Sequence, residues 1–192
     1  KYSYGYSKHS FPFSPPIFNG RFLYKSPNRG DVVVFKTPAD NRTDYIKRLI
    51  GKPGDEIQFI NGDLFINGSK VVREETKISE PIRCGNFILE TNIFVETLPN
   101  GVTYLAAYNK QGTLKNTKKY IVPKDHIFLM GDNRDCSKDS RFLDDVGYVK
   151  NLNLVGKAKI IFFSNDTKKG SLLKFWNLQN SFRFERTFKI LK

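Results

Sequence analysis

Short runs of apolar and β-branched residues recur along the chain, and each run is closed by a turn sequence. These runs cover Asp31–Lys36, Tyr45–Ile50, Glu56–Ile60, Asp63–Ile66, Lys70–Val72, Phe87–Leu98, Val102–Tyr108, Tyr120–Val122, Ile127–Met130 and Val155–Phe163. Several alternate apolar and polar residues with the period of two that is typical of half-buried strands. Helical periodicity is scarce, with short candidates over Ser137–Asp145 and in the tail after Gly170. The pattern predicts an all-β protein of mostly antiparallel sheets with little helix.

The turn sequences between the runs predict hairpins. Asn61-Gly62 is the strongest two-residue hairpin signal, because both residues readily adopt a positive φ. Pro99-Asn100-Gly101 predicts another hairpin, and Pro53-Gly54 favours a type II turn. Since hairpins dominate the middle of the chain, we expect a β core from residues 1–57 and 120–165 with a smaller hairpin-rich lobe, residues 58–119, inserted into it. Residues 166–192 form a basic aromatic tail that we expect to pack on the core or on a membrane surface.

The composition excludes several classes of protein. The chain has 192 residues, of which 39% are hydrophobic and 14% aromatic, so it is not a disordered protein. Its two Cys and two His are too few for a disulfide scaffold or a zinc ribbon. Apolar stretches such as Val32–Phe35 and Ile160–Phe163 are far shorter than the ~20 residues of a membrane span. We expect a folded, basic protein that is poor in metal-ligating residues.

The charge bears on the partners of this protein. Lys and Arg number 32 against 19 Asp and Glu, so the formal charge is +13, which attracts phosphate in nucleic acids or in anionic lipids. The basic residues are spread along the chain without a nucleic-acid-binding motif, so no nucleic acid is expected. Aromatic and basic residues mix near both ends, as suits a lipid–water interface, although the rings also suit a core. The aromatic residues are Phe11, Phe13, Phe18, Phe22, Tyr24, Phe175, Trp176, Phe182, Phe184 and Phe188.

Lys47 is a candidate general base. Side chains alternate along a strand, so Tyr45, Lys47 and Leu49 share one face of the run Tyr45–Ile50. A lysine between an aromatic ring and a leucine is partly desolvated, and desolvation lowers its pKa because it penalises the ammonium form. The neutral amine accepts a proton, whereas the ammonium does not. The alternative is a solvated lysine on an exposed strand.

The polar segment Gly131–Arg141 follows the apolar run Ile127–Met130 and is predicted to be a loop held by side-chain hydrogen bonds. Within it, Asp139 and Arg141 are predicted to form a charge-assisted pair that stabilises the loop. Cys136 suggests a nucleophile, but a cysteine hydrolase needs a partner base, and His9 and His126 are the only histidines. The plain alternative for this segment is a polar surface loop.

Together, and in order, three stretches resemble the bacterial type I signal peptidases, membrane-bound serine–lysine proteases that remove signal peptides from exported proteins. Arg29–Phe35 is similar to the first core strand of that family, Tyr45–Asp55 to its lysine box, and Gly131–Arg141 to its closing box. Two positions depart from the usual pattern, with Lys52 in place of Leu and Cys136 in place of Asn. The resemblance implies a signal-peptidase-like β core as the catalytic region, on the outer face of the bacterial cytoplasmic membrane.

The resemblance also implies roles for individual residues. Lys47 matches the general base, and Ser137 matches the serine whose hydroxyl hydrogen-bonds and orients that lysine. A supporting set of salt bridges matches Arg48, Asp139 and Arg141. The residues on the strand that pairs with the backbone of the substrate are Asp44, Tyr45 and Ile46. The implied partners are the signal-peptide region of exported preproteins, cut after small-X-small sequences, and an anionic membrane surface. The resemblance implies that no metal or organic cofactor is required.

One part of the family pattern is missing from the sequence. The nucleophilic serine of the family lies in a Pro-Ser-Gly-Ser-Met-like box upstream of the stretch that Lys1–Gly5 resembles, and neither Ser10 nor Ser14 has such neighbours. We therefore expect the 192 residues to carry the base without the nucleophile and to be inactive alone, as a piece of a longer protein. The alternatives are an inactive homologue at the membrane surface, a relative that processes something other than secretory signal peptides (such as a conjugation-type maturation protease), and a basic nucleic-acid-binding β module.

Export of the chain would expose its two cysteines to an oxidising compartment. A bridge between Cys84 and Cys136 is then one outcome, and two free thiols are the other. The position of Cys136 in the closing box, beside Ser137, favours the free thiols.

Overall fold

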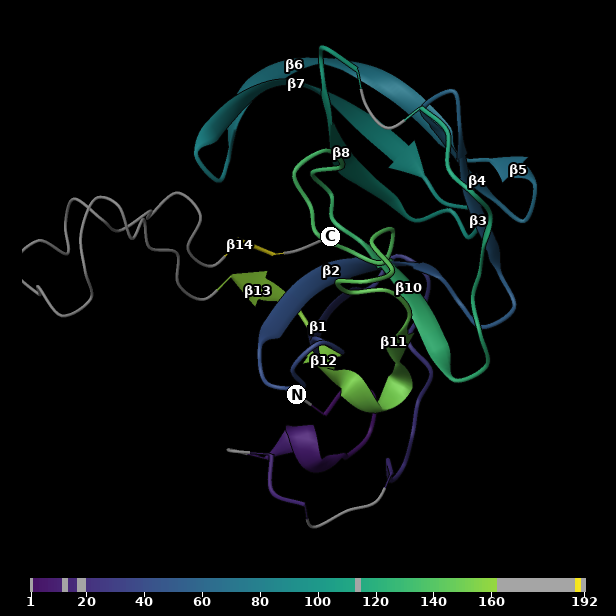
Figure 1. The fold of residues 1–192 in the computed structure, drawn as a ribbon, viewed down its shortest axis with the longest axis vertical. Helices are drawn as coiled ribbons and strands as arrows, with labels where there is room; N and C mark the ends of the chain where they lie inside the picture. The colour runs from purple at the N-terminus through teal and green to yellow at the C-terminus, as the bar shows by residue number, and fades with distance from the viewer. Residues whose placement is uncertain (1, 12–13, 17–19, 113–114, 162–188, 191–192) are drawn as a thin grey trace, which may run out of the picture. The chain divides into compact units, whose positions relative to one another are not determined.

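The computed structural model describes residues 2–11, 14–16, 20–112, 115–161 and 189–190 (Figure 1). Strands dominate these residues, and the helices among them are two single-turn 3₁₀ helices, η1 (Lys8–Ser10) and η2 (Asn151–Asn153). The predicted all-β class with antiparallel pairing is therefore confirmed. The predicted helix after Gly170 lies outside the described residues, as do most of the tail and its aromatic residues.

The central sheet has five strands in the order β11-β10-β2-β1-β12, and all neighbours are antiparallel. Its strands are β1 (Val32–Lys36), β2 (Asp44–Gly51), β10 (His126–Met130), β11 (Val149–Lys150) and β12 (Leu154–Lys157). The first three coincide closely with predicted runs, because apolar runs bounded by turns are a local property of the chain.

Two smaller sheets come from the middle of the chain. One has the order β5-β4-β3-β9 and the other β6-β7-β8. Their strands are β3 (Glu56–Ile60), β4 (Asp63–Ile66), β5 (Ser69–Lys70), β6 (Val72–Cys84), β7 (Phe87–Thr97), β8 (Thr103–Asn109) and β9 (Tyr120–Ile121). The predicted hairpin at Asn61-Gly62 is confirmed, and both residues have a positive φ, as a type I′ turn requires.

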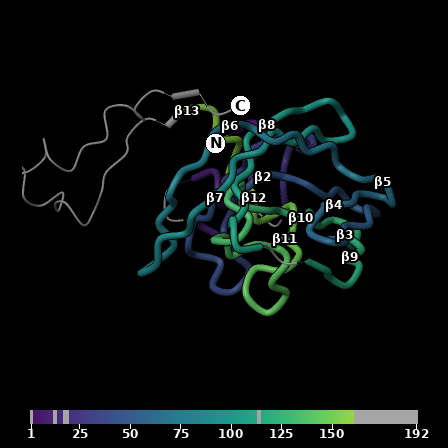
Figure 2. The backbone as a smooth tube through the Cα atoms, turned by 90° about the horizontal axis from the view of Figure 1, so that it is seen from above, coloured from purple at the N-terminus to yellow at the C-terminus, as the bar shows by residue number. Residues whose placement is uncertain are grey.

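The pair β6–β7 forms a long curved hairpin, visible in Figures 1 and 2. The single strand predicted over Lys70–Val72 was wrong, because Lys70 ends β5, Val72 begins β6, and the rest of β6 was not predicted. Most side chains of β6 are exposed on both faces, so its sequence lacks the alternation that marks a half-buried strand. A register shift between Glu75 and Ser79 interrupts the ladder.

The helix predicted over Ser137–Asp145 does not form, and turns and bends take its place. Ser140, Asp139 and Arg141 make hydrogen bonds to neighbouring backbone and side-chain groups instead, so this segment is held by the polar contacts described below.

The central sheet is buried on both faces. Leu49 belongs to one hydrophobic cluster and Ile50 to another, because neighbouring residues of β2 point to opposite faces. The cluster around Ile50 joins the central sheet to strands of the middle segment, through residues such as Phe59 and Tyr104. This burial makes β2 and β10 a rigid base for the loop that follows β10.

The contacts of the backbone divide the chain into two units, Lys1–Lys157 and Ala158–Lys192. In the second unit, β13 (Ile160–Ile161) pairs with β14 (Lys189–Ile190). The predicted core, inserted lobe and tail remain predictions. Within the described residues, no helix is long and apolar enough to cross a membrane.

Candidate functional site

Strand β2 presents Lys47 where its two neighbouring strands overlap incompletely. Strand β1 pairs along the whole of Asp44–Arg48, with Val33 opposite Lys47. Strand β10 reaches only as far as Arg48, which lies opposite Met130. In the described part of the chain, the residues Asp44–Lys47 therefore have a strand partner on one edge only. That open edge offers backbone groups for pairing with another extended chain.

The surroundings of Lys47 lower its pKa. The side chain is half-buried, and Nζ lies 5.6 Å from the centroid of the Tyr45 ring on the same strand face. Burial is the largest cause of the lowered pKa. The carboxylates of Asp139 and Asp132 raise the pKa of Lys47, and the guanidinium of Arg141 lowers it. All three lie in the loop Gly131–Arg141, here called the closing loop, which therefore supplies these electrostatic effects. The predicted partial desolvation of this lysine is confirmed.

The loop after β10 brings Ser137 to the face of the sheet that carries Lys47. Extending the β2–β10 register by one residue places Gly131 beside Lys47, and opposed residues in an antiparallel pair point to the same face. A Cβ added to Gly131 would lie 2.4 Å from Cβ of Ser137 and 2.1 Å from its Oγ. Ser137 thus occupies the space that a side chain at position 131 would fill, and only glycine allows this approach.

The hydroxyl of Ser137 is buried and has no hydrogen-bond partner among the described residues. The predicted hydrogen bond between Ser137 and Lys47 is therefore not formed in this structure. An unused buried hydroxyl beside a desolvated lysine is an available acceptor for that amine. The orienting role of Ser137 stays a prediction.

The predicted pair of Asp139 and Arg141 is confirmed, and both residues are buried. Arg141 donates from Nε to Oδ1 of Asp139 at 2.8 Å and from Nη2 to Oδ2 at 2.9 Å, which is a bidentate arrangement. Oδ2 of Asp139 also accepts from the backbone amide of Gly131 at 3.0 Å. The pair therefore holds the start of the loop against its end and positions the segment that carries Ser137.

Arg48 was expected in the supporting set of salt bridges, with no partner named for it, and its carboxylate partner is Asp132. Arg48 donates from Nε and Nη2 to the two carboxylate oxygens of Asp132, both at 2.8 Å. Its Nη1 donates to the carbonyl oxygen of Gly30 at 2.8 Å, and its guanidinium lies 4.2 Å from the centroid of the Tyr104 ring. The pairing follows from the register, because Arg48 lies opposite the last residue of β10, two residues before Asp132.

A buried ionic cluster beneath the loop was not predicted. Arg134 and Glu96 are each 1% exposed and form a salt bridge of 2.6 Å. Both carboxylate oxygens of Glu96 also accept from hydroxyls, those of Tyr104 and Tyr108. The carbonyl of Arg134 accepts from Arg141, so the cluster supports the loop from below. The alternation of residues along β7 does not predict that Glu96, a charged residue, faces the interior.

Cys84 and Cys136 form a disulfide with a Cα–Cα distance of 5.5 Å, so the expectation of two free thiols was wrong. The bond ties the tip of the β6–β7 hairpin to the residue before Ser137. The two cysteines are 52 residues apart in the sequence, so their contact could not be predicted from local patterns. The long β6–β7 hairpin brings them together. Cys136 is consequently not a thiol nucleophile in this structure.

The residues predicted to meet a substrate lie on the open half of β2. Asp44 and Ile46 are exposed, Tyr45 is half-buried, and Asp44 makes a salt bridge of 2.9 Å with Lys36. Alternate side chains of this half-strand thus point to solvent and to the sheet. Among the described residues, no group of three or more His, Cys, Asp or Glu is placed to hold a metal ion.

Residues 1–163 match the protein family described as signal peptidase, peptidase S26. A signal peptidase I of Rickettsia conorii is 43% identical over 179 residues, which cover 85% of this chain and 63% of that protein. One from Rickettsia bellii (strain OSU 85-389) is 39% identical over 209 residues, covering 100% of this chain and 70% of that protein. A crystal structure of a signal peptidase I from Enterococcus faecalis is 28% identical, with a TM-score of 0.40, covering 69% of this chain and 97% of that one. The chain thus spans less than two thirds of the Rickettsia conorii relative.

Proposed function

The chain belongs to the peptidase S26 family of signal peptidases, and from this premise we propose that it is the lysine-bearing catalytic region of a type I signal peptidase. The reaction is endoproteolytic removal of N-terminal signal peptides from exported preproteins, after small-X-small sequences. The observation that carries this proposal is the half-buried Lys47, whose lowered pKa and position beside the Gly131–Ser137 contact suit a general base.

In the proposed reaction, neutral Lys47 takes the proton from a serine hydroxyl while that oxygen attacks the scissile carbonyl carbon. The lysine then gives the proton to the leaving amine as the peptide bond breaks, and water releases the acyl group from the serine. No serine of the 192 residues has the neighbours of the family's nucleophile. We therefore assign the nucleophile to a segment outside these residues, and the 192 residues alone are expected to be inactive.

The closing loop positions the base. Ser137 has an unused buried hydroxyl, which accepts a hydrogen bond from Lys47 in the proposed active state. The Asp139–Arg141 salt bridge stabilises the closing loop. Arg48 stabilises the first residues of the loop through its salt bridge with Asp132. Because Ser137 orients the base and does not transfer a proton, its loss is expected to lower the rate less than the loss of Lys47.

The open edge of β2 is the proposed binding site for the substrate. A preprotein segment in extended conformation adds to Asp44, Tyr45 and Ile46 as a further strand, with affinity from main-chain hydrogen bonds. Shallow sites between alternate side chains of this half-strand select small residues. The protein is proposed to act at an anionic membrane surface, on the outer face of the bacterial cytoplasmic membrane, with no nucleic acid as a partner.

The test is cleavage of a preprotein, followed by mass spectrometry of the products. We compare the 192-residue chain with the same chain extended at its N-terminus by a segment that carries the serine box. The extended protein is expected to cut after a small-X-small sequence, and the shorter chain is not. Cleavage by the shorter chain would identify a nucleophile within it, and no cleavage by either would favour an inactive homologue.

Variants of the extended protein test the assigned base. Lys47→Arg keeps the positive charge but removes the titratable amine, so the rate is expected to fall by orders of magnitude. Lys119→Arg is the matched control, because Lys119 pairs with Glu56 on the surface and an arginine preserves that pair. Near-normal turnover by Lys47→Arg would remove Lys47 from the mechanism.

A further inference from the structure

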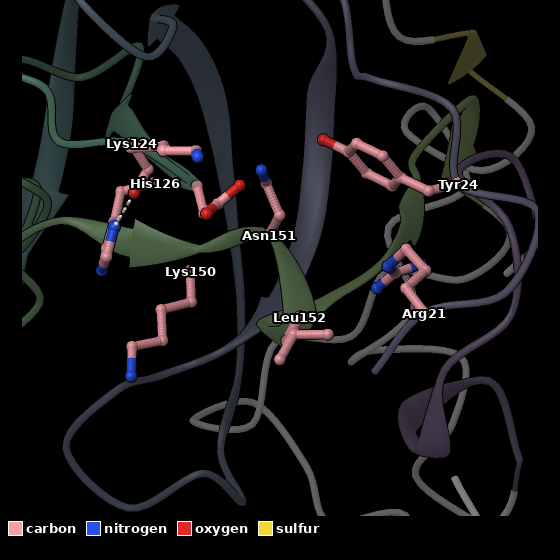
Figure 3. A pocket seen from close by; sticks show the side chains of 8 residues that line it. Arg21, Tyr24, Lys124, His126, Lys150, Asn151 and Leu152 are labelled. Atoms are coloured by element: carbon pink, nitrogen blue, oxygen red, sulfur yellow. Dashed lines mark hydrogen bonds between the residues drawn. The ribbon is translucent and has the colours of Figure 1, made fainter. Parts of the chain in front are cut away.

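A cavity of about 470 Å³ lies apart from the Lys47 site. It is lined by Arg21, Tyr24, Lys124, Asp125, His126, Lys150, Asn151 and Leu152. In Figure 3, Arg21 and Tyr24 lie on one side, Lys124, His126 and Lys150 on the other, and Asn151 between them. His126 begins β10 and Met130 ends it beside the closing loop, so roughly 14 Å of strand separates the cavity from that loop.

Positive charge prevails in this cavity. Arg21, Lys124 and Lys150 form no ion pair with any described carboxylate, and Asp125 is the one carboxylate in the lining. Arg21 is half-buried, and burial lowers its pKa because no opposite charge compensates its own. Its guanidinium donates hydrogen bonds to carbonyl oxygens, including that of Gly5 at 3.3 Å, and to the hydroxyl of Ser7. An anion in the cavity would supply the missing counter-charge.

Two buried polar atoms in the lining have no partner in the described structure. They are Nε of Arg21, which is a donor, and Oδ1 of Asn151, which is an acceptor. Buried polar groups are almost always satisfied by protein, water or ligand. Nε of Arg21 can donate to an anionic oxygen of a ligand. Oδ1 of Asn151 and the carboxylate of Asp125 can accept from hydroxyl groups next to that oxygen. A phosphate group esterified to glycerol has that combination.

Exposed apolar side chains flank the cavity. Phe22 and Leu23, between Arg21 and Tyr24 in the sequence, are 66% and 65% exposed, and Leu152 in the lining is 45% exposed. Leu23 has a φ of +51°, a conformation that is uncommon for a residue with a branched side chain. Apolar side chains beside a cationic cavity match the order of layers in a membrane leaflet, where phosphate groups border the acyl chains.

We propose that this cavity binds the phosphoglycerol headgroup of an anionic lipid, with Phe22 and Leu23 entering the boundary with the acyl chains. Arg21, Lys124 and Lys150 meet the phosphate, and Asp125 and Asn151 accept from the glycerol hydroxyls. The inference rests on the proposed location at a membrane surface, but it does not depend on the peptidase reaction. It makes the membrane contact specific to one headgroup, whereas the charge of +13 alone attracts any anionic surface.

The test is flotation of the chain with phosphatidylcholine vesicles that contain phosphatidylglycerol, phosphatidylserine or neither. Lys124→Gln with Lys150→Gln removes two exposed cavity lysines. Lys77→Gln with Lys118→Gln removes two exposed lysines elsewhere that likewise form no ion pair with a carboxylate in the described part of the chain. We expect the first pair to lose binding to phosphatidylglycerol vesicles about thirtyfold, which is the fold-change for two lysines at about 1 kcal/mol each. The control pair is expected to retain most of the binding. Thermal unfolding of both variants checks that each remains folded.

The outcomes separate the cavity from the membrane location. Preference of the wild-type chain for phosphatidylglycerol over phosphatidylserine, lost only in the cavity variant, supports the inference. Equal losses in both variants would overturn the cavity as a site while leaving the membrane surface as a partner. Absence of flotation with either anionic lipid would overturn both. Binding of soluble glycerol phosphate without flotation would overturn the lipid as the source of the ligand.

Discussion

The disulfide between Cys84 and Cys136 offers a direct test of how the hairpin supports the closing loop. In the oxidised chain, the bond closes a loop of 52 residues between the hairpin tip and the residue before Ser137. A cross-link of that length restricts the unfolded chain by about 4 kcal/mol in the loop-closure model. The double variant Cys84→Ser with Cys136→Ser is therefore expected to lose about 4 kcal/mol of its free energy of unfolding.

The assay is urea unfolding of the wild-type chain and the double variant, each with and without a reductant. Reductant is expected to destabilise the wild type to about the level of the variant and to leave the variant unchanged, because the variant has no thiol. A loss of less than about 1 kcal/mol, below the usual range for a native disulfide, would refute the reasoning. The same outcome would mean that other contacts hold the hairpin tip on the loop.

Four further outcomes are expected. Since burial lowers the pKa of Lys47, the unfolded chain binds more protons than the folded one below the ordinary lysine pKa of 10.5. The wild-type stability contributed by this group therefore rises as the pH rises toward 10.5, and Lys47→Met is expected to abolish that rise in unfolding experiments at several pH values. The cleavage rate of the extended protein should also rise with pH, with a midpoint below 10.5, and a flat profile would contradict Lys47 as the base. Glu96→Gln leaves Arg134 buried without its carboxylate and is expected to lower the free energy of unfolding by about 3–5 kcal/mol in urea titrations. Gly131→Ala places a methyl group where Ser137 lies, so cleavage should fall sharply, and an unchanged rate would show that the position of Ser137 is not important.

Local features of the sequence sufficed for most of the strands and for the candidate base. Asn61-Gly62 predicts its hairpin because a type I′ turn depends on the φ preferences of two adjacent residues. The position of Lys47 beside Tyr45 on a strand face follows from alternation within a single strand. Asp139 and Arg141 are two residues apart, so their pair is also a local property. The family resemblance rested on motifs of this local kind, and the relatives bear it out.

The partners of the remaining groups depend on where distant segments of the chain meet. Arg48 and Asp132 are paired through the register of β2 with β10, and the disulfide joins cysteines that a long exposed hairpin brings together. Glu96 of β7 meets Arg134 because the loop after β10 pairs with the neighbouring strand β8, where Asn133 forms a bridge with Ala107. A sequence shows which side chains are charged or carry a thiol. A charged side chain needs a partner if it is buried, because an unpaired buried charge costs free energy. The tertiary structure alone decides which partner each one finds, because long-range pairing follows from the packing of the whole chain and not from the neighbours of any residue.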